Sequence, residues 1–260
     1  MGNQPSIFIT GGARGIGLSI GKLFLEQGWK VGLYDIDAAE LEKVRQELAN
    51  ENLLTGTLDV TNSDSAQVTL QQFAEATGGR LDVLVNNAGM VRVGEFEATP
   101  LADYQQMVTL NLAGPITMTY QALPWLKTTP NSRIVNVSSA SAIYGNPELT
   151  VYAATKVAVR NLTEGWRLGF AKFGIHATAI LPIYTRTRMV DDYVHLYQGL
   201  KLKDVTLTAE DVARVCWKAA TGRKRTVWYV GAKTKLLFAV RPFMTDGVIR
   251  FLTRRELKYK

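Results

Sequence analysis

A tyrosine and a lysine lie four residues apart in the segment VYAATK, residues 151–156. Side chains at positions i and i+4 of a helix meet on one face, so Tyr152 and Lys156 could share one proton site. A phenol beside an ammonium group is a candidate for general acid–base chemistry. An ordinary amphipathic helix would carry the same pair, and the hexapeptide alone leaves both interpretations open.

A glycine-rich segment, TGGARGIG at residues 10–17, lies between the apolar run SIFIT and a helix-forming stretch. Glycine permits a tight turn and lets the backbone approach a ligand closely. The N-terminus of the following helix offers free N–H groups and a positive dipole end, which suit a pyrophosphate. The residues predicted to bind a dinucleotide here are Gly11, Arg14, Gly15, Ile16 and Gly17.

The second apolar run ends at Asp35, in the sequence LYDID. A carboxylate at this strand end can accept hydrogen bonds from both adenosine ribose hydroxyls and would repel a 2′-phosphate, so NAD is predicted over NADP. Arg14 leaves NADP as an alternative cofactor, because a guanidinium in the loop could contact the 2′-phosphate. Asp37 is predicted to cap the next helix.

Two further strand ends complete the predicted cofactor crevice. The segment LDV places Asp59 and Val60 where the adenine should lie, although Asp59 could instead be a cap or turn residue. In the segment NNAG, two amides at a buried strand end must find partners, and the small residues after them leave room for a ligand. We therefore assign Asn87, Ala88 and Gly89 to the cofactor site.

The elements that must position these residues alternate along the chain. Short apolar runs separated by helix-length segments are typical of a parallel sheet covered on both faces. This predicts an α/β fold: a single doubly wound, Rossmann-like domain over residues 1–260, with about seven strands. The predicted strands are 6–10, 30–35, 53–60, 81–88, 133–139, 175–182 and 226–231.

The charge of the 260-residue chain is unevenly distributed. Its net charge is +7, but residues 222–260 hold eleven Lys or Arg against Asp246 and Glu256, a net +9 that leaves −2 for residues 1–221. A slightly acidic body argues against nucleic-acid binding. One cysteine permits no internal disulfide and favours a cytoplasmic setting, and with two histidines it supplies a metal site poorly.

Together these motifs resemble the short-chain dehydrogenase/reductase family. The matching segments, in family order over residues 6–187, are TGGARGIG, Asp35, LDV, NNAG, NLAG (111–114), VSS (137–139) and YAATK (152–156). The resemblance implies an oxidoreductase that moves a hydride between a nicotinamide cofactor, NAD preferred, and a secondary alcohol or ketone. It also implies a small-molecule substrate and a homodimer or homotetramer.

The resemblance also implies roles for four residues. Tyr152 would be the general acid/base, with its pKa lowered by Lys156 and by the oxidised nicotinamide. Lys156 would also hold the nicotinamide ribose. Ser139 would orient the substrate oxygen, and Asn111 would help to bind a water that connects Lys156 to solvent.

The chain departs from the family after its sixth predicted strand, in the segment LPIYTRT. Pro182 and Thr187 are kept, but Ile183 replaces a glycine. If the backbone there needs a glycine conformation, a β-branched residue would be strained. Thr187 is assigned to the nicotinamide carboxamide on the family pattern.

Residues 186–205 are predicted to form a substrate lid, because loops at strand ends carry specificity in such folds. An apolar, aromatic wall would favour a hydrophobic substrate, whereas Arg186 and Arg188 could instead bind a carboxylate. The residues predicted for the wall are Ile143, Tyr144, Met189, Tyr193, Leu196 and Tyr197.

Residues 233–260 form a basic extension with interspersed apolar side chains. Such a segment can lie on an anionic membrane surface, or pack on the domain or on a partner subunit. The predicted location is therefore cytoplasmic, with peripheral membrane contact left open. Two other functions remain open on this fold: a catalytically idle NAD-binding sensor and a membrane-surface interaction protein.

Overall fold

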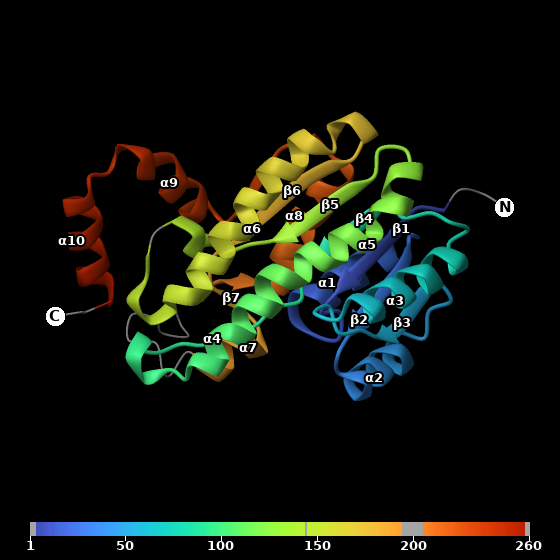
Figure 1. The fold of residues 1–260 in the computed structure, drawn as a ribbon, viewed down its shortest axis with the longest axis horizontal. Helices are drawn as coiled ribbons and strands as arrows, with labels where there is room; N and C mark the ends of the chain where they lie inside the picture. Colours follow the sequence, from blue (N-terminus) through green and yellow to red (C-terminus); the bar gives the residue numbers. More distant parts are fainter. Residues whose placement is uncertain (1–3, 144, 194–204, 258–260) are drawn as a thin grey trace.

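The computed structural model describes residues 4–143, 145–193 and 205–257. Seven parallel strands form one sheet in the order β3-β2-β1-β4-β5-β6-β9 (Figure 1). These strands are β1 (Ser6–Thr10), β2 (Lys30–Asp35), β3 (Leu53–Thr57), β4 (Val83–Asn86), β5 (Arg133–Val137), β6 (His176–Pro182) and β9 (Val227–Val230). The predicted doubly wound sheet is confirmed, and each of the seven predicted runs contains one of its strands.

Helices cover both faces of this sheet. On one face α1, α2 and α8 enclose a core with β1 and β2, and on the other α3, α5 and α6 enclose a second core (Figure 1). The bounds of these and the remaining α-helices of the main body are α1 (Gly15–Glu26), α2 (Ala38–Leu48), α3 (Ser63–Ala76), α4 (Leu101–Val108), α5 (Gly114–Thr128), α6 (Thr150–Gly169), α7 (Arg188–Tyr193) and α8 (Ala209–Thr221).

The spacing of apolar residues explains why α1 forms and where it packs. Its buried residues Gly17, Ile20, Gly21 and Phe24 recur at the three- and four-residue intervals of one helical face. A Cβ on Gly21 would lie 2.6 Å from a methyl carbon of Leu33, so this glycine lets α1 approach β2 closely. That approach brings the N-terminus of α1 to the end of β1.

Short elements connect the main ones. Two-residue strands β7 (Thr185–Arg186) and β8 (Leu207–Thr208) pair in a separate parallel ladder. A π-helical turn, η2 (Thr109–Ala113), joins α4 to α5. The 3₁₀ turns of the main body are η1 (Phe96–Ala98), η3 (Ala140–Ile143), η4 (Pro147–Leu149) and η5 (Ala171–Phe173).

The extension after β9 forms α9 (Ala232–Val240), the 3₁₀ turn η8 (Arg241–Phe243) and α10 (Asp246–Leu257). Figure 1 shows these elements at the end of the molecule opposite the N-terminus, with α10 standing apart from the main body. None of the helices in the described ranges has both the length and the apolar character needed to cross a membrane.

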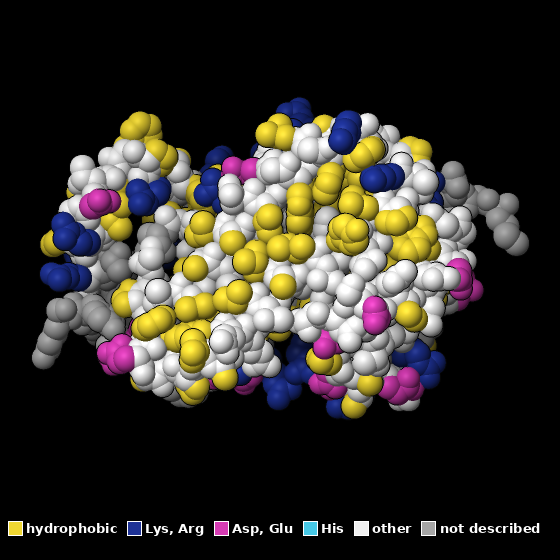
Figure 2. Space-filling view, viewed as in Figure 1, with side chains coloured by type: hydrophobic (Ala, Val, Ile, Leu, Met, Phe, Trp, Pro, Cys, Tyr) yellow, Lys and Arg dark blue, Asp and Glu magenta, His cyan; other side chains and the backbone are white. Residues whose placement is uncertain are grey.

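Hydrophobic side chains are exposed along the outer surface of α4, α5 and α6, and Figure 2 shows them running across this face. We call this region the α4–α6 surface. Its exposed large apolar residues are Leu101, Val108, Ile116, Tyr120, Val157 and Leu168.

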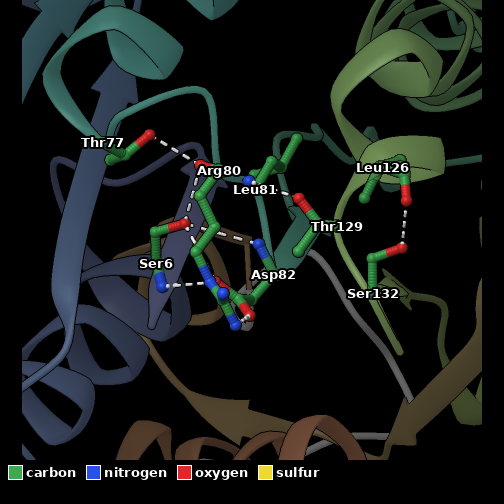
Figure 3. Close-up of polar contacts among 8 residues, drawn as sticks. All are labelled: Ser6, Thr77, Arg80, Leu81, Asp82, Leu126, Thr129 and Ser132. Carbon is green, nitrogen blue, oxygen red and sulfur yellow. Dashed lines mark hydrogen bonds and ion pairs between the residues drawn. The ribbon is translucent and has the colours of Figure 1, made fainter. Parts of the chain in front are cut away.

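Polar contacts close the amino end of the sheet (Figure 3). Arg80 donates to both carboxylate oxygens of Asp82 at 2.7 and 2.6 Å, and Asp82 accepts the backbone N–H of Ser6 at 2.9 Å. The Thr77 and Ser6 hydroxyls both donate to the carbonyl oxygen of Arg80. The polar groups of this cluster therefore satisfy one another at the edge of the sheet away from the glycine-rich turn.

The carboxyl end of the sheet has a different character. β1 pairs with β2 on one side and with β4 on the other, so the strand order reverses at β1. The loops that follow β1 and β4 diverge at such a switch point and leave a crevice, where ligands bind in open α/β sheets. The segments 10–17 and 86–89 both lie there.

Candidate active site

Helix α6 carries Tyr152 and Lys156 on one face. The Lys156 Nζ atom lies 5.6 Å from the centroid of the Tyr152 ring. Nζ donates to the carbonyl oxygen of Val137 at 3.0 Å, and the Ser138 hydroxyl donates to the carbonyl oxygen of Lys156 at 2.8 Å. The residues at the end of β5 thus hold both the side chain and the backbone of Lys156. Ser138 has a structural role here, because its hydroxyl holds the lysine backbone.

Burial dominates the acid–base properties of this pair. Loss of solvent raises the pKa of Tyr152, while a hydrogen bond with the side chain of Ser139 opposes that rise. Burial lowers the pKa of Lys156 to about 8. The lowering of the tyrosine pKa expected from Lys156 and an oxidised nicotinamide stays a prediction for the cofactor-bound site. In the chain by itself the removal of both groups from water favours their neutral forms.

Asn111 lies in the π-helical turn η2 and is almost fully buried. Its Oδ1 accepts the backbone N–H of Met90 at 2.8 Å, and its Nδ2 donates to the carbonyl oxygen of Met90 at 2.9 Å. Nδ2 also donates to the hydroxyl of Thr155 at 3.3 Å. The side chain therefore ties the loop after β4 to helix α6, next to Lys156.

Gly89 lies between these two groups. A Cβ built on Gly89 would be 3.0 Å from Asn111 Oδ1 and 3.6 Å from Lys156 Nζ. The absence of a side chain lets the loop after β4 pass close to the lysine. This places the end of the NNAG segment beside the catalytic candidates.

The glycine-rich turn adopts a backbone that needs glycine at several positions. Gly11 and Gly15 have φ values of +66° and +55°, in the left-handed region that favours glycine. A Cβ on Gly17 would lie 2.1 Å from the carbonyl oxygen of Gly11, which no side chain can tolerate. The side chain of Arg14, the N-cap residue of α1, forms no capping hydrogen bond, so the first N–H groups of the helix face the crevice uncapped.

Asn87 braces this turn from the neighbouring strand. Its Nδ2 donates to the carbonyl oxygens of Thr10 and Gly11 at 2.9 and 3.0 Å. The Thr10 hydroxyl accepts the backbone N–H groups of Asn87 and Ala88, both at 3.0 Å. Sequence reasoning missed Thr10, although a hydroxyl at a buried strand end, directly before a glycine turn, must find partners.

Asp35 is oriented by two backbone groups. Its carboxylate accepts the N–H of Ala13 and the N–H of Asp37, both at 3.1 Å. Because each carboxylate oxygen has two acceptor sites, capacity remains for the two hydroxyls of a ribose.

Arg14 pairs with Asp37 rather than standing free in the loop. Asp37 also caps α2, where its side chain accepts the N–H of Glu40. The Glu40 N–H and then the Arg14 guanidinium hold the pKa of the Asp37 carboxyl below its ordinary value, although partial desolvation opposes them. The carboxylate balances the charge on Arg14, which weakens the case for a 2′-phosphate.

The segment after β3 supplies a turn. Asp59 accepts the backbone N–H and the hydroxyl of Thr61 at 2.9 and 2.7 Å. Val60 is buried, and a Cβ on Gly114 would lie 2.9 Å from one of its methyl carbons. These contacts favour the turn interpretation of Asp59 and place Val60 against the start of α5.

A cavity opens beside Tyr152 and Ser139, and most of its lining is apolar. The lining residues are Ile16, Val91, Val93, Ser139, Ala140, Ser141, Asn146, Leu149, Tyr152, Pro182, Ile183, Tyr184, Thr185, Thr187, Met189, Val190, Tyr193 and Leu237.

Several predicted wall residues need correction. Met189 and Tyr193 line the cavity, but Ile143 does not and packs in the interior instead. The predictions for Tyr144, Leu196 and Tyr197 lie outside the described residues. Sequence reasoning missed Val91, Val93, Leu149, Tyr184 and Leu237, which distant loops and α9 bring to the site.

The two arginines proposed to bind a carboxylate do not line the cavity. Arg186 is exposed, and Arg188 lies 3.8 Å from Asp192 across a solvated turn of α7. Neither arginine is therefore placed at the cavity to bind a carboxylate.

Ile183 lines the cavity without backbone strain. Among the described residues, only Ala49 and Asn131 have a positive φ without being glycine. The condition for strain at Ile183 is therefore not met, because this backbone does not need a glycine conformation.

Part of the predicted 186–205 lid is visible as β7 and α7. The Tyr193 hydroxyl accepts a hydrogen bond from Arg92 Nη1 at 2.9 Å, and Arg92 Nε lies 3.1 Å from Asp103 on α4. This chain of contacts fixes the end of α7 over the cavity. Residues 194–204 of the predicted lid lie outside the described residues.

No group of three or more His, Cys, Asp or Glu side chains in the described ranges could hold a metal ion. Cys216 is buried, and burial raises the pKa of its thiol to about 12.

The sequence profile of the short chain dehydrogenases matches residues 5–197. The 3-oxoacyl-[acyl-carrier-protein] reductase FabG of Thermotoga maritima is 34% identical over 216 residues, which cover 80% of this chain and 86% of the relative. An uncharacterized oxidoreductase of Staphylococcus aureus is 30% identical over 185 residues, covering 71% and 80% of the two chains.

Solved structures share the fold. A 3-ketoacyl-(acyl-carrier-protein) reductase of Brucella melitensis, complexed with NADH, has a TM-score of 0.80 at 24% identity, covering 88% of this chain and 98% of that one. The ligand-free aldohexose dehydrogenase of Thermoplasma acidophilum has a TM-score of 0.77 at 22% identity, covering 90% and 95%.

Proposed function

The chain belongs to the short-chain dehydrogenases, and from that premise we propose that it oxidises a hydrophobic secondary alcohol, or reduces the ketone, with NAD(H). The observation that carries this proposal is the position of Tyr152. Its phenol contacts Ser139 and lines an apolar cavity, one helical turn from Lys156 and next to the glycine-rich turn.

In this proposal Tyr152 moves the proton. A bound nicotinamide cofactor supplies or accepts the hydride. The Tyr152 phenol oxygen, as phenolate, takes the alcohol proton during oxidation and returns it during reduction. The Ser139 hydroxyl holds the substrate oxygen against that phenol.

Lys156 makes the phenolate accessible at neutral pH. With a pKa of about 8, its ammonium form predominates at pH 7. A positive charge on Lys156 and another on the oxidised nicotinamide would both favour the phenolate, against the desolvation that opposes it. Asn111 acts as a positioning residue, since its side chain is occupied by Met90 and Thr155 and holds the loop next to Lys156.

The cofactor is NAD in this proposal. The turn of residues 11–17 holds the pyrophosphate, and Asp35 accepts the adenosine ribose hydroxyls. Asp35 repels a 2′-phosphate, while the Arg14 guanidinium that could attract one is paired with Asp37. Val60 would border the adenine, Asn87 to Gly89 would border the ribose, and Thr187 would face the carboxamide, while Asp59 holds the turn at Thr61.

The cavity supplies the argument for the substrate class. Its lining is mostly apolar and aromatic, with the Ser139 and Tyr152 hydroxyls as the polar groups beside the reacting carbon. The Thermotoga relative is named as a reductase of 3-oxoacyl groups, which supports ketone reduction as the type of chemistry.

A substrate panel tests the proposal. Purified protein is mixed with alcohols and ketones of increasing chain length, and the change in nicotinamide absorbance is followed with NAD(H) and with NADP(H). We expect turnover that increases with the apolar surface of the substrate and is faster with NAD(H). Equal rates for charged and apolar substrates would contradict the substrate class, and faster turnover with NADP(H) would contradict the role of Asp35.

The α4–α6 surface supports an oligomer. Its apolar residues lie on three neighbouring helices, and side chains as exposed as Tyr120 and Leu168, at 71% and 80%, are unfavourable in water when they form a continuous surface. A second copy of the chain can cover it symmetrically. We assign this surface to a homodimer contact.

A further inference from the structure

The C-terminal extension borders the substrate cavity. Leu237 of α9 lines the cavity, and the ring of Phe238 packs 4.8 Å from the ring of Tyr229. Arg241 Nε donates to the carbonyl oxygen of Ile143 at 3.3 Å, on the η3 turn that follows Ser139. The first part of the extension is therefore fixed against the wall of the active site.

The rest of the extension presents large apolar side chains to solvent. Phe243 is 86% exposed, Phe251 is 64% exposed and Leu236, next to the cavity residue Leu237, is 63% exposed. Val248 lies three residues before Phe251, on the same face of α10, and is also exposed. A cluster of this kind on a soluble surface indicates a binding site.

Basic side chains accompany these apolar ones, and Figure 2 shows the two kinds interspersed at this end of the molecule. Lys233, Lys235, Arg250, Arg254 and Arg255 are all exposed. Residues 233–260 hold eight Lys or Arg against Asp246 and Glu256, a net charge of +6 that leaves +1 for residues 1–232. The attraction to an anionic surface is therefore concentrated at the end of the molecule that holds α9 and α10.

We propose that α9 and α10 dock on an anionic lipid surface and hold the mouth of the cavity against it, so that the substrate is a lipophilic alcohol or ketone dissolved in the bilayer. The proposed substrate rests on the proposed oxidoreductase activity, whereas the proposed docking on lipid does not. Charge favours a lipid surface over a second copy: two extensions of +6 repel each other, while phenylalanine and arginine together suit the headgroup region.

Vesicle co-sedimentation of the full chain tests the docking. We expect binding to vesicles that contain phosphatidylglycerol, no binding to phosphatidylcholine alone, and release as salt is raised, because salt screens the attraction between basic residues and an anionic surface. Absence of binding to the phosphatidylglycerol vesicles at low salt would overturn the proposal.

Two double variants locate the contact. Phe243→Ser with Phe251→Ser, and Arg250→Glu with Arg254→Glu, should each lower the vesicle partition coefficient at least about tenfold. Matched controls outside the extension are Phe96→Ser, which replaces another exposed phenylalanine, and Lys43→Glu with Lys172→Glu, which reverses two other exposed cations. Circular dichroism checks that every variant keeps the fold.

If the control variants lower the vesicle partition coefficient as much as the extension variants do, the assignment of the lipid contact to the extension is overturned. A change of oligomeric state without lipid in the extension variants, with vesicle binding unchanged, would show that a second copy covers α10 and would overturn the proposal.

A kinetic comparison tests whether the substrate is taken from the bilayer. The extension variants should raise KM for a long-chain secondary alcohol presented in vesicles, and leave KM for a short water-soluble alcohol unchanged. An unchanged KM for the vesicle-borne alcohol would overturn the proposal that the substrate is taken from the bilayer. Vesicle binding without turnover of any alcohol or ketone would support docking and overturn the oxidoreductase activity, so the two failures can be distinguished.

Discussion

Buried titratable residues set the pH response of this protein at the scale of single side chains. His176, the first residue of β6, is 5% exposed and contacts Arg167 Nη1 at 2.9 Å. Burial, together with the positive charges of Arg167, Arg133 and Lys224, lowers the pKa of this imidazole to about 4, although a hydrogen bond with the carbonyl of Arg225 opposes the shift. The folded protein therefore holds His176 neutral where the unfolded chain would protonate it.

This difference predicts a pH-dependent stability. Between the unfolded pKa near 6.5 and the folded pKa of about 4, the unfolded chain binds more protons at His176, so the free energy of unfolding falls as the pH falls through that window. The contribution lost is about 3 kcal/mol at most. Urea unfolding of the wild type and of His176→Gln at several pH values measures it. The variant should lose less stability between pH 6.5 and 4, and parallel curves would contradict the assignment.

Residue types and their order predicted the reactive groups, but not every neighbour. Tyr152, Lys156 and Ser139 were assigned by motif and spacing, and the structure brings all three together. Thr10 and Leu237 were missed because their roles depend on tertiary contacts between distant segments. The rise of the Tyr152 pKa in the chain without cofactor was not predicted, because burial is not visible in a local motif.

At the scale of elements, a capping box begins α8. The Thr208 hydroxyl accepts the N–H of Asp211, and the Asp211 carboxylate accepts the N–H of Thr208. α8 packs beside α1 on one face of the sheet, so its start supports the helix whose N-terminus forms the glycine-rich turn.

Loss of this cap should destabilise the domain. We expect Thr208→Ala to lower the free energy of unfolding by about 1 kcal/mol, since the Asp211 N–H at the helix start loses the hydroxyl that accepts it. Thr208→Ser keeps the hydroxyl and serves as the control, and its free energy of unfolding should change by only about a few tenths of a kcal/mol. Chemical denaturation measures both, and an equal loss in the two variants would contradict the capping role.

Element types were predictable, and their ends were less so. Alternating apolar runs and helical segments gave the seven strands of the main sheet, since burial on both faces demands continuous apolar strands. The predicted strands 53–60 and 81–88 are too long, since β3 ends at Thr57 and β4 spans only Val83–Asn86. The residues beyond these bounds belong to turns and side-chain contacts, such as the Asp59–Thr61 turn and the Arg80–Asp82 pair. The two-residue strands β7 and β8 and the π-helical turn have no periodic pattern long enough to indicate them.

At the scale of the whole molecule, the two exposed apolar regions lead to different expectations. The α4–α6 surface is covered by a second copy in our proposal, whereas the extension docks on lipid. Substitution of Tyr120→Glu with Val157→Glu should therefore convert the dimer to a monomer without lipid, because a dimer would bury the added charges. Light scattering after size exclusion measures the mass.

Leu236→Glu, in the extension, is the control for this experiment and should leave the dimer intact. Dissociation by Leu236→Glu, with an unchanged dimer in the α4–α6 variant, would place the subunit contact on the extension instead. Such a result would also remove the surface that the lipid proposal requires.

The central claim is that the phenol of Tyr152 transfers the substrate proton, and Tyr152→Phe tests it most directly. This change removes the hydroxyl and keeps the ring. We expect kcat to fall at least about a hundredfold, within the range for general acid–base catalysis, while NADH binding measured by fluorescence stays within about twofold of wild type. Turnover at the wild-type rate in this variant would contradict the account.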